Sequence, residues 1–182
     1  MKDARIFLNS LDEARKILAE HGAVSKGYYE IHDIIYAPKD ASKTIADEFL
    51  RLRLVPVNIW NEKAVVLAIK NTKSNVVGKE SVIPLKLQFD QESEARAYIE
   101  ANLADKYAFD YEFSRIGWQY FMPNGDGVDL EDIEGHRSIE FKSPTQEGLE
   151  KILDIFGVKR EDVIKSASVV AVKEMLSSKI LR

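Results

Sequence analysis

The chain has 182 residues, of which 31% are charged and 45% hydrophobic, and its formal net charge is −4. This length is enough for one domain with a sizeable core, so we expect residues 1–182 to form a single domain. A sequence pI of about 5.5 argues against a nucleic-acid partner, because general nucleic-acid binders are basic. Cysteine is absent, which excludes disulfides and cysteine-bound metals. No apolar run approaches the length that spans a bilayer, and the first residues lack the apolar stretch of a signal peptide, so we expect a cytoplasmic protein with no membrane partner.

The first elements are a short strand and a helix. The strand is predicted from Asp3 to Leu8. Ser10 and Glu13 match a capping box, in which the hydroxyl and the carboxylate satisfy free backbone amides at a helix start. An apolar stripe follows, and Gly22 is a natural helix end. The stripe consists of Leu11, Ala14, Ile17 and Leu18.

Aromatic and β-branched residues predict a strand from Val24 to Tyr36. A hairpin from Ala46 to Lys73 is predicted after it. Arg51 and Arg53 fall on one face of the first hairpin strand, because successive side chains alternate across a strand. Phe49 shares their face, and leucines form the other face. The leucines are Leu50, Leu52 and Leu54, and in the second strand Val66, Ala68 and Lys70 share a face.

The cationic face of this hairpin has two interpretations. Charged residues of antiparallel sheets are most often solvated, and the hairpin alone favours that interpretation. The alternative is a cationic wall that binds a polyanion, because the arginine fork matches phosphate oxygens bidentately.

The middle of the chain predicts a strand, a helix and a second strand. The first strand covers Ser81 to Phe89, where Pro84 suggests an edge or a strand start. Asp90 is expected to cap a helix from Gln91 to about Leu103, and a long aromatic strand covers Phe109 to Met122. One face of the first strand is expected to carry Val82, Pro84, Lys86 and Gln88.

The last part of the chain predicts a strand pair within 128–141, with its turn at 134–137. Ser143 followed by Pro144 is typical of a helix N-cap and first turn. After that helix we expect a short helical turn and then a strand through Val169 to Val172.

The order of these elements indicates an α+β fold. Few helices separate the strands, so hairpins dominate and the sheet should be mostly antiparallel. If the polar faces of the strands turned inward, the sheet would close into a polar-lined barrel. Periodicity alone leaves open which face turns inward.

Several segments, in this order along nearly the whole chain, resemble the CYTH domain family, the triphosphate tunnel metalloenzymes that include class IV adenylate cyclases and thiamine triphosphatases. IHDIIYAP resembles the family's Asp-aromatic strand, with Asp33 on the Asp. EFLRLR resembles its Leu-Arg-x-Arg strand, with Arg51 and Arg53 on the arginines. VVLAIKNTK places Lys70 on a family lysine, and EFSRIGWQYFM places Arg115 on a phosphate-binding arginine.

The resemblance implies an antiparallel barrel of eight strands, flanked by helices, whose interior tunnel holds a triphosphate-containing small molecule or a polyphosphate. It implies cations that bind the phosphates and carboxylates that hold Mg²⁺ or Mn²⁺, hard ions that prefer oxygen ligands. The phosphate-binding candidates are Arg5, Arg51, Arg53, Lys70, Lys86, Arg115 and Lys142. The metal-binding candidates are Asp3, Glu131 and Glu140.

The departures from the family pattern fall mostly on its metal ligands. The N-terminal Glu-x-Glu-x-Lys reads Met1-x-Asp3-x-Arg5, so one carboxylate is lost and one is shortened. Gln88 replaces a glutamate, and the final Glu-x-Glu ends in Lys142, which cannot ligate a metal while charged. The Gly-Pro that follows the family lysine is also absent. This charge balance favours an anion-binding tunnel that uses less metal, or none.

Three functions therefore stay open at the level of sequence. The first is a metal-dependent triphosphatase or an adenylate cyclase-like phosphorus–oxygen lyase, for which the sequence assigns no catalytic residue. The second is a non-catalytic module that binds a triphosphate, polyphosphate or other anion. The third is a protein-interaction module with solvated charges. The third case predicts no concave cluster of these cations. Whatever the function, Arg115 has the alternative of an ion pair with a neighbour such as Asp110 or Glu112, and Asp3, Glu131 and Glu140 have the alternative of pairing with the tunnel's own cations.

Overall fold

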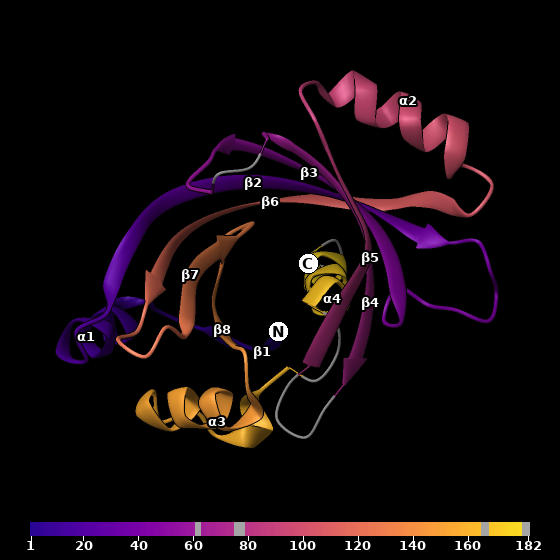
Figure 1. Cartoon of the computed structure of the whole chain (residues 1–182). Coiled ribbons are helices and arrows are strands. Elements are labelled where there is room, and N and C mark those ends of the chain that lie inside the picture. The colour runs from indigo at the N-terminus through magenta and orange to yellow at the C-terminus, as the bar shows by residue number, and fades with distance from the viewer. Residues whose placement is uncertain (61–62, 75–78, 165–167, 180–182) are drawn as a thin grey trace.

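Eight strands close into a barrel in the order β1-β5-β4-β3-β2-β6-β7-β8, and each neighbouring pair is antiparallel (Figure 1). The computed structural model describes residues 1–60, 63–74, 79–164 and 168–179. The strands are β1 (Lys2–Leu8), β2 (Val24–Pro38), β3 (Glu48–Val57), β4 (Val65–Ser74), β5 (Lys79–Phe89), β6 (Tyr107–Phe121), β7 (Gly127–Ile133) and β8 (His136–Ser143). The helices are α1 (Asp12–Glu20), α2 (Glu92–Asn102), α3 (Gln146–Ile155), the 3₁₀ turn η1 (Arg160–Asp162) and α4 (Ser168–Lys179). The predicted α+β fold with an eight-stranded antiparallel barrel is confirmed.

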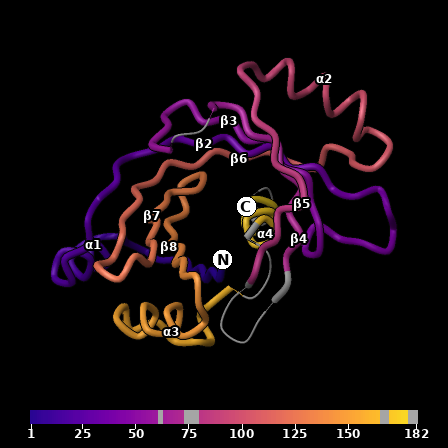
Figure 2. The backbone as a smooth tube through the Cα atoms, in the orientation of Figure 1, coloured from indigo at the N-terminus to yellow at the C-terminus, as the bar shows by residue number. Residues whose placement is uncertain are grey.

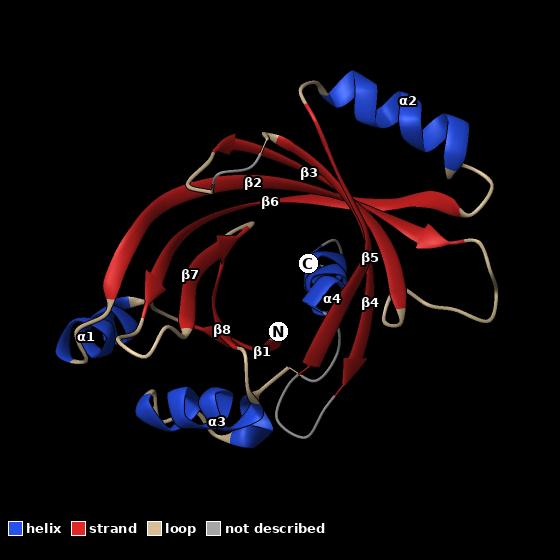
Figure 3. Ribbon diagram, viewed as in Figure 1, coloured by secondary structure: helices blue, strands red, loops and turns tan. Residues whose placement is uncertain are grey.

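The outer face of the barrel carries the apolar side chains, and helices cover it (Figure 3). Leu50 and Leu52 of β3 are fully buried in one cluster with Ala95 and Ile99 of α2. Since side chains alternate along a strand, this packing turns the arginines of β3 toward the interior. A second cluster joins β1, β7 and β8 to α1 and α3, and its most buried members include Leu18, Leu130, Phe141 and Leu149.

The backbone trace shows β2 and β6 running side by side over most of their length (Figure 2). Their pairing extends from Val24 opposite Phe121 to Pro38 opposite Tyr107. Among the helices of the described residues, none combines the length and apolar character that crossing a membrane requires.

Helix α4 lies within the opening of the barrel rather than on its outer face (Figure 1). Val169 and Val172 pack against Ile35, Phe49 and Phe113, so the helix fills one end of the interior with apolar side chains. The strand predicted through Val169 to Val172 is therefore wrong. The valines favour a strand locally, but their three-residue spacing puts both on one face of a helix, and burial against the barrel decides the structure.

A bulge in β5 divides the face predicted for that strand. Asn71 pairs with Val82, whereas Ile69 pairs with Leu85. Between these two pairs β5 therefore has one residue more than β4, which makes the bulge. Pro84 lies within this irregularity, which fits its lack of a backbone donor. Val82 is consequently exposed on the outside, and it does not share a face with Lys86 as the alternation predicted.

The predicted helix starts are each displaced by one or two residues. Helix α1 begins at Asp12, and Ser10 accepts a hydrogen bond from the Asp12 amide instead of forming a capping box with Glu13. Gln91, not Asp90, caps α2. Thr145 rather than Ser143 caps α3, because Ser143 still belongs to β8, where it pairs with Lys2.

The turn between β7 and β8 is tighter than the sequence indicated. It consists of Glu134 and Gly135 alone, with φ of 51° and 86°. Positive φ at both positions is the geometry of a two-residue type I′ hairpin turn, which keeps the flanking strands in register. His136 and Arg137, predicted to lie in the turn, are the first residues of β8.

Gly117 in β6 makes room for the side chain of Tyr29, its partner on β2. A Cβ atom at Gly117 would lie 2.3 Å from Cζ of Tyr29. The ring cannot move aside easily, because it is buried, its hydroxyl donates to Glu131 and it packs against Trp60.

We therefore expect Gly117→Ala to lower the free energy of unfolding by about 1–3 kcal/mol, the usual effect of overpacking. Urea denaturation measures the change. Gly127→Ala in β7 is the matched control, since its added Cβ would meet nothing closer than 3.5 Å. Equal stability of the two variants would contradict the tight fit around Tyr29.

Candidate functional site

The barrel encloses a central cavity of about 240 Å³ that side chains from all eight strands line. Its charged lining comprises six cations and five carboxylates. The cations are Arg5, Arg51, Arg53, Lys70, Arg115 and Lys142, and the carboxylates are Asp3, Asp33, Asp129, Glu131 and Glu140. This is an unusual density of charge for a protein interior, where ions are costly unless paired.

Asp33 of β2 gathers the arginines of the neighbouring strands. Its two oxygens accept from Nε and Nη2 of Arg53 at 2.7 and 2.9 Å, a bidentate pair. Nε of Arg51 lies 3.7 Å from the same carboxylate, and Nη2 of Arg115 donates to it at 3.2 Å. Burial raises the pKa of Asp33, but Arg53 and Arg115 lower it more. The pKa of this carboxyl therefore lies well below its usual range, and the group is ionised at neutral pH.

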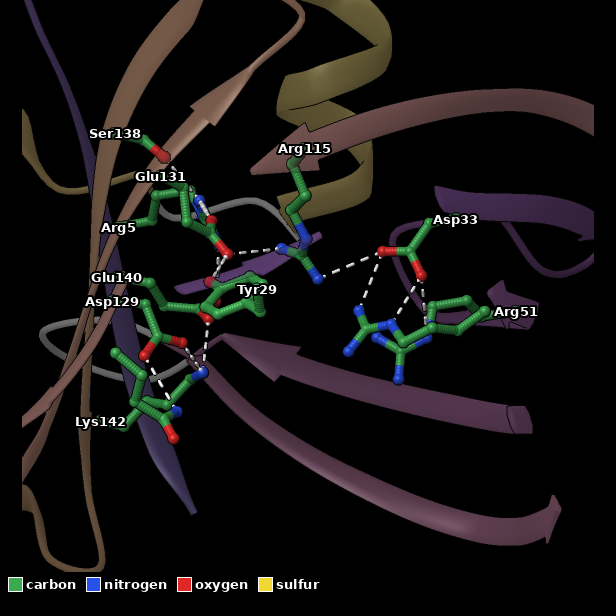
Figure 4. Close-up of polar contacts among 12 residues, drawn as sticks. Arg5, Tyr29, Asp33, Arg51, Arg115, Asp129, Glu131, Ser138, Glu140 and Lys142 are labelled. Atoms are coloured by element: carbon green, nitrogen blue, oxygen red, sulfur yellow. Dashed lines mark hydrogen bonds and ion pairs between the residues drawn. The ribbon is translucent and has the colours of Figure 1, made fainter. Parts of the chain in front are cut away.

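Arg115 of β6 joins the two halves of the charged lining. Its Nη1 lies 3.0 Å from Oε1 of Glu131, while its Nη2 reaches Asp33 on the other side (Figure 4). Asp110 and Glu112, the alternative partners considered from the sequence, instead contact Lys173 and His32. The side chain of Arg115 is therefore an interior group.

Glu131 of β7 is the most enclosed carboxylate of this lining. Arg5 of β1 donates to its Oε2, and the hydroxyl of Tyr29 donates to its Oε1 at 2.6 Å. Arg5 is itself fully buried and also donates to Ser138 at 2.7 Å. Burial raises the pKa of Glu131, but Arg115 and Arg5 lower it below its ordinary value.

Lys142 of β8 connects two further carboxylates. Its ammonium contacts Oδ2 of Asp129 and lies 3.0 Å from Oε2 of Glu140. Gln119 donates to the other oxygen of Asp129 at 3.0 Å. Burial lowers the pKa of Lys142, but Asp129 and Glu140 raise it above its ordinary value, so the lysine stays charged.

Among the described residues, Asp129, Glu131 and Glu140 are close enough to share one metal ion, with one oxygen from each within 4.8 Å of the others. We call these three residues the acidic group. Carboxylate oxygens suit Mg²⁺ and Mn²⁺. Asp3 lines the same cavity but lies outside the acidic group.

Lys70 and Arg51 are the cavity cations whose charge is least favoured. Burial lowers the pKa of Lys70 to about 7, and repulsion from Arg51 adds to this effect. Burial likewise lowers the pKa of Arg51 to about 9, with Arg53 adding to it, so its guanidinium remains charged at neutral pH. The Nε of Arg51 and the Nε of Arg115 are buried without a hydrogen-bond acceptor among the described residues.

A second cavity of about 190 Å³, which we call the side cavity, adjoins the first. The two share Arg51, Arg53 and Lys142. Lys63 and Lys86 add two more cations, and no carboxylate occurs among the described residues that line it. Trp60 borders both cavities.

All ten site residues predicted from the sequence line one of these cavities. Six of the seven phosphate-binding candidates line the central cavity, whereas Lys86 lines the side cavity. The predicted metal ligands Asp3, Glu131 and Glu140 all line the central cavity. Whether these residues bind phosphate or metal stays a prediction.

The ten predicted site residues do not include three charged residues of the cavity linings, namely Asp33, Lys63 and Asp129. Asp33 had been matched to a family aspartate without a role, whereas Asp129 was missed altogether. It lies two positions before Glu131, so the alternation that turns Glu131 inward also turns Asp129 inward. That signal was present in the VDLEDI segment. Its partners Lys142 and Gln119 lie on other strands, so the ion pair itself had no local signature.

No family model matches the chain, and no curated protein matches it either. Solved structures do match. The PH1819 protein from Pyrococcus horikoshii OT3 is 20% identical with a TM-score of 0.72, over 96% of this chain and 98% of that one. A candidate adenylate cyclase from Vibrio parahaemolyticus is 13% identical with a TM-score of 0.65, over 96% of both chains.

A third structure is HpAC1 from Hippeastrum, a candidate adenylyl cyclase described as having a dominant triphosphatase activity. It is 16% identical with a TM-score of 0.60, over 96% of both chains. At these identities the comparisons establish the fold. This chain therefore has the CYTH-like fold of the adenylate cyclase-like and triphosphatase-like proteins, as its sequence motifs predicted.

Proposed function

We propose that this chain binds a triphosphate-containing small molecule, or a polyphosphate, inside the barrel through its own arginine and lysine side chains. The observation that carries the proposal is the pair of buried guanidinium N–H groups, on Arg51 and Arg115, without an acceptor among the described residues. A buried donor that lacks an acceptor costs free energy. A phosphate oxygen in the central cavity would supply one.

The charge of the two cavities supports the same ligand class. The side cavity has five cations and no carboxylate among its described lining residues. Arginine binds phosphate oxygens in a fork, and such pairs are stronger where water is excluded. The two adjoining cavities together offer room for an extended anion rather than a single phosphate.

The structural neighbours support a triphosphate as that anion. The Hippeastrum protein, which shares the fold, is described by its triphosphatase activity. An inward-facing wall of arginine and lysine on a shared fold makes a triphosphate the ligand class to test first in this chain.

A metal-dependent triphosphatase or cyclase is the second candidate function, and the acidic group is the observation that favours it. For this function Asp129, Glu131 and Glu140 would have to exchange their ion pairs with Arg5, Arg115 and Lys142 for the metal ion, which would polarise a phosphoryl oxygen when bound. Arg51, Arg53 and Arg115 would bind and orient the phosphate chain beside it.

Removing a cavity cation should weaken anion binding. We expect Arg51→Ala and Lys70→Ala each to reduce the affinity for inorganic triphosphate by about 1–3 kcal/mol, the range for a charge-assisted hydrogen bond. Isothermal titration calorimetry measures the loss. Lys16→Ala is the matched control, because Lys16 is exposed on α1 and pairs with Glu20. Unchanged affinity in both cavity variants would overturn the proposal.

Metal dependence and turnover separate the two candidate functions. The same titrations are made with ATP and with inorganic triphosphate, each with Mg²⁺ and with EDTA, beside a phosphate-release assay. Binding that survives EDTA, without phosphate release, supports the anion-binding function. Binding that needs the metal and is followed by release supports the enzyme.

The affinity should also depend on pH through Lys70. Its pKa in the free protein is about 7, and a bound phosphate favours the charged lysine, so the pKa rises in the complex. Between these two pKa values binding takes up a proton, and affinity therefore falls by up to about tenfold for each pH unit as the pH rises.

Titrations with inorganic triphosphate between pH 7 and 9 measure this effect. The triphosphate titrates as well, so the relevant quantity is the ratio of the wild-type affinity to that of Lys70→Met. We expect this ratio to shrink as the pH rises. A constant ratio would show that Lys70 does not take up the proton.

A further inference from the structure

The carboxylate oxygens that a divalent ion would need as ligands already contact donors from the chain. Arg5 donates to Oε2 of Glu131, while Tyr29 and Arg115 contact its Oε1. For Glu140, Arg5 lies 3.0 Å from Oε1 and Lys142 lies 3.0 Å from Oε2.

The third member of the acidic group is bound in the same way. Gln119 donates to Oδ1 of Asp129, and Lys142 contacts its Oδ2. Each of the six carboxylate oxygens of the acidic group is therefore already in contact with a donor from the chain itself. A divalent ion would have to displace those donors, so the residues as arranged do not fit it.

The charges lead to the same conclusion. The acidic group carries three negative charges, and Arg5, Arg115 and Lys142 contact it with three positive charges. A divalent ion would add two positive charges to a group that is already neutralised. Cations at contact distance repel one another strongly in a poorly solvated interior.

Strand register explains why a cation is required at the position of the Lys142 ammonium. Asp129 and Glu140 are directly opposite each other on β7 and β8, and both face inward. Like charges at opposed positions of a sheet destabilise it. Lys142 is two residues beyond Glu140 on the same face of β8, and its ammonium contacts both carboxylates (Figure 4).

The residue opposite Lys142 leaves room for this contact. Gly127 of β7 pairs with Lys142, and a Cβ atom at Gly127 would lie 3.5 Å from Cβ and 3.9 Å from Cδ of the lysine. At these distances the stem of the lysine is not crowded by the opposite strand.

We propose that the Lys142 ammonium is a built-in replacement for a divalent cation: it neutralises Asp129 and Glu140 and faces the anion-binding cavities, so that removing it uncovers a metal site in the acidic group. Lys142 lines both cavities and is 31% exposed, whereas Arg5 is fully buried. Lys142 is thus the removable cation of the group. The metal-site part of this proposal is independent of the proposed function, and only the role toward the anion rests on it.

The test measures Mn²⁺ binding to the full chain in the absence of any phosphate compound. Electron paramagnetic resonance detects the Mn²⁺ that stays free in solution and so gives the affinity. Lys142→Met removes the ammonium and keeps most of the volume, and Lys142→Arg is the matched control that keeps the charge. We expect Lys142→Met to bind one Mn²⁺ at least about tenfold more tightly than the wild type and Lys142→Arg, because a unit positive charge at contact distance has been removed. Asp129→Asn added to Lys142→Met should abolish the gain.

Two outcomes would overturn the proposal. One is a folded Lys142→Met protein with no gain in Mn²⁺ affinity, folding being judged by its circular dichroism and thermal transition. The other is a tight Mn²⁺ site in the wild type that Asp129→Asn removes, which would show that the ammonium yields to the metal.

A separate titration distinguishes this proposal from the proposed function. Wild-type binding of inorganic triphosphate should be the same in EDTA as in Mg²⁺. If the wild type binds no triphosphate at all, the proposed function fails, while the Mn²⁺ result still decides the role of Lys142.

Discussion

The structure depends on the mutual neutralisation of the charges inside its barrel. Eleven charged side chains line the central cavity, and an unpaired ion there would cost several kcal/mol. Arg115 links the cluster around Asp33 to the cluster around Glu131. Because each carboxylate of the network contacts cations from other strands, the pairing that neutralises the charges also fixes the relative positions of β1, β2, β3, β6, β7 and β8. The same ion pairs therefore stabilise the closed barrel and determine the arrangement of charges in the cavity.

The apolar side chains explain how these charges come to lie inside. Leu50 and Leu52 bury their side chains against α2 on the outside of the barrel. Burial of such leucines is among the largest favourable terms in folding, and alternation then leaves Arg51 and Arg53 facing inward. The sequence was sufficient to predict this division of faces, a mostly antiparallel sheet and the α+β class. It was not sufficient to say which face turns inward, because that depends on the position of α2 relative to the closed sheet.

The largest errors of the sequence-based predictions concern features that depend on residues far apart in the chain. Val169 and Val172 favour a strand by local propensity, yet contacts with Phe49 and Phe113 in the barrel interior hold them in a helix. The bulge at Pro84 depends on pairing with β4, and it reversed the predicted face of Val82. At the site, the CYTH resemblance pointed to side chains that line the two cavities, but it did not indicate the ion pair between Lys142 and Asp129. That pair exists only through the register of β7 against β8, which no local pattern encodes.

A tethered ammonium and a divalent ion solve the same electrostatic problem with different chemical consequences. Both separate the opposed carboxylates Asp129 and Glu140, but the lysine is covalently part of the chain, so a chelator cannot remove it. An ammonium also offers only hydrogen-bond donors and one charge. It cannot lower the pKa of a coordinated water or polarise a phosphoryl oxygen as a bound metal ion does. Under the proposal for Lys142, the cavity would keep the positive charge that binds a phosphate chain, and the ammonium would take the place of the Lewis acid that helps to cleave one. On this reasoning, the step that separates an anion-binding barrel from a triphosphatase of the same fold is the identity of the cation between two carboxylates.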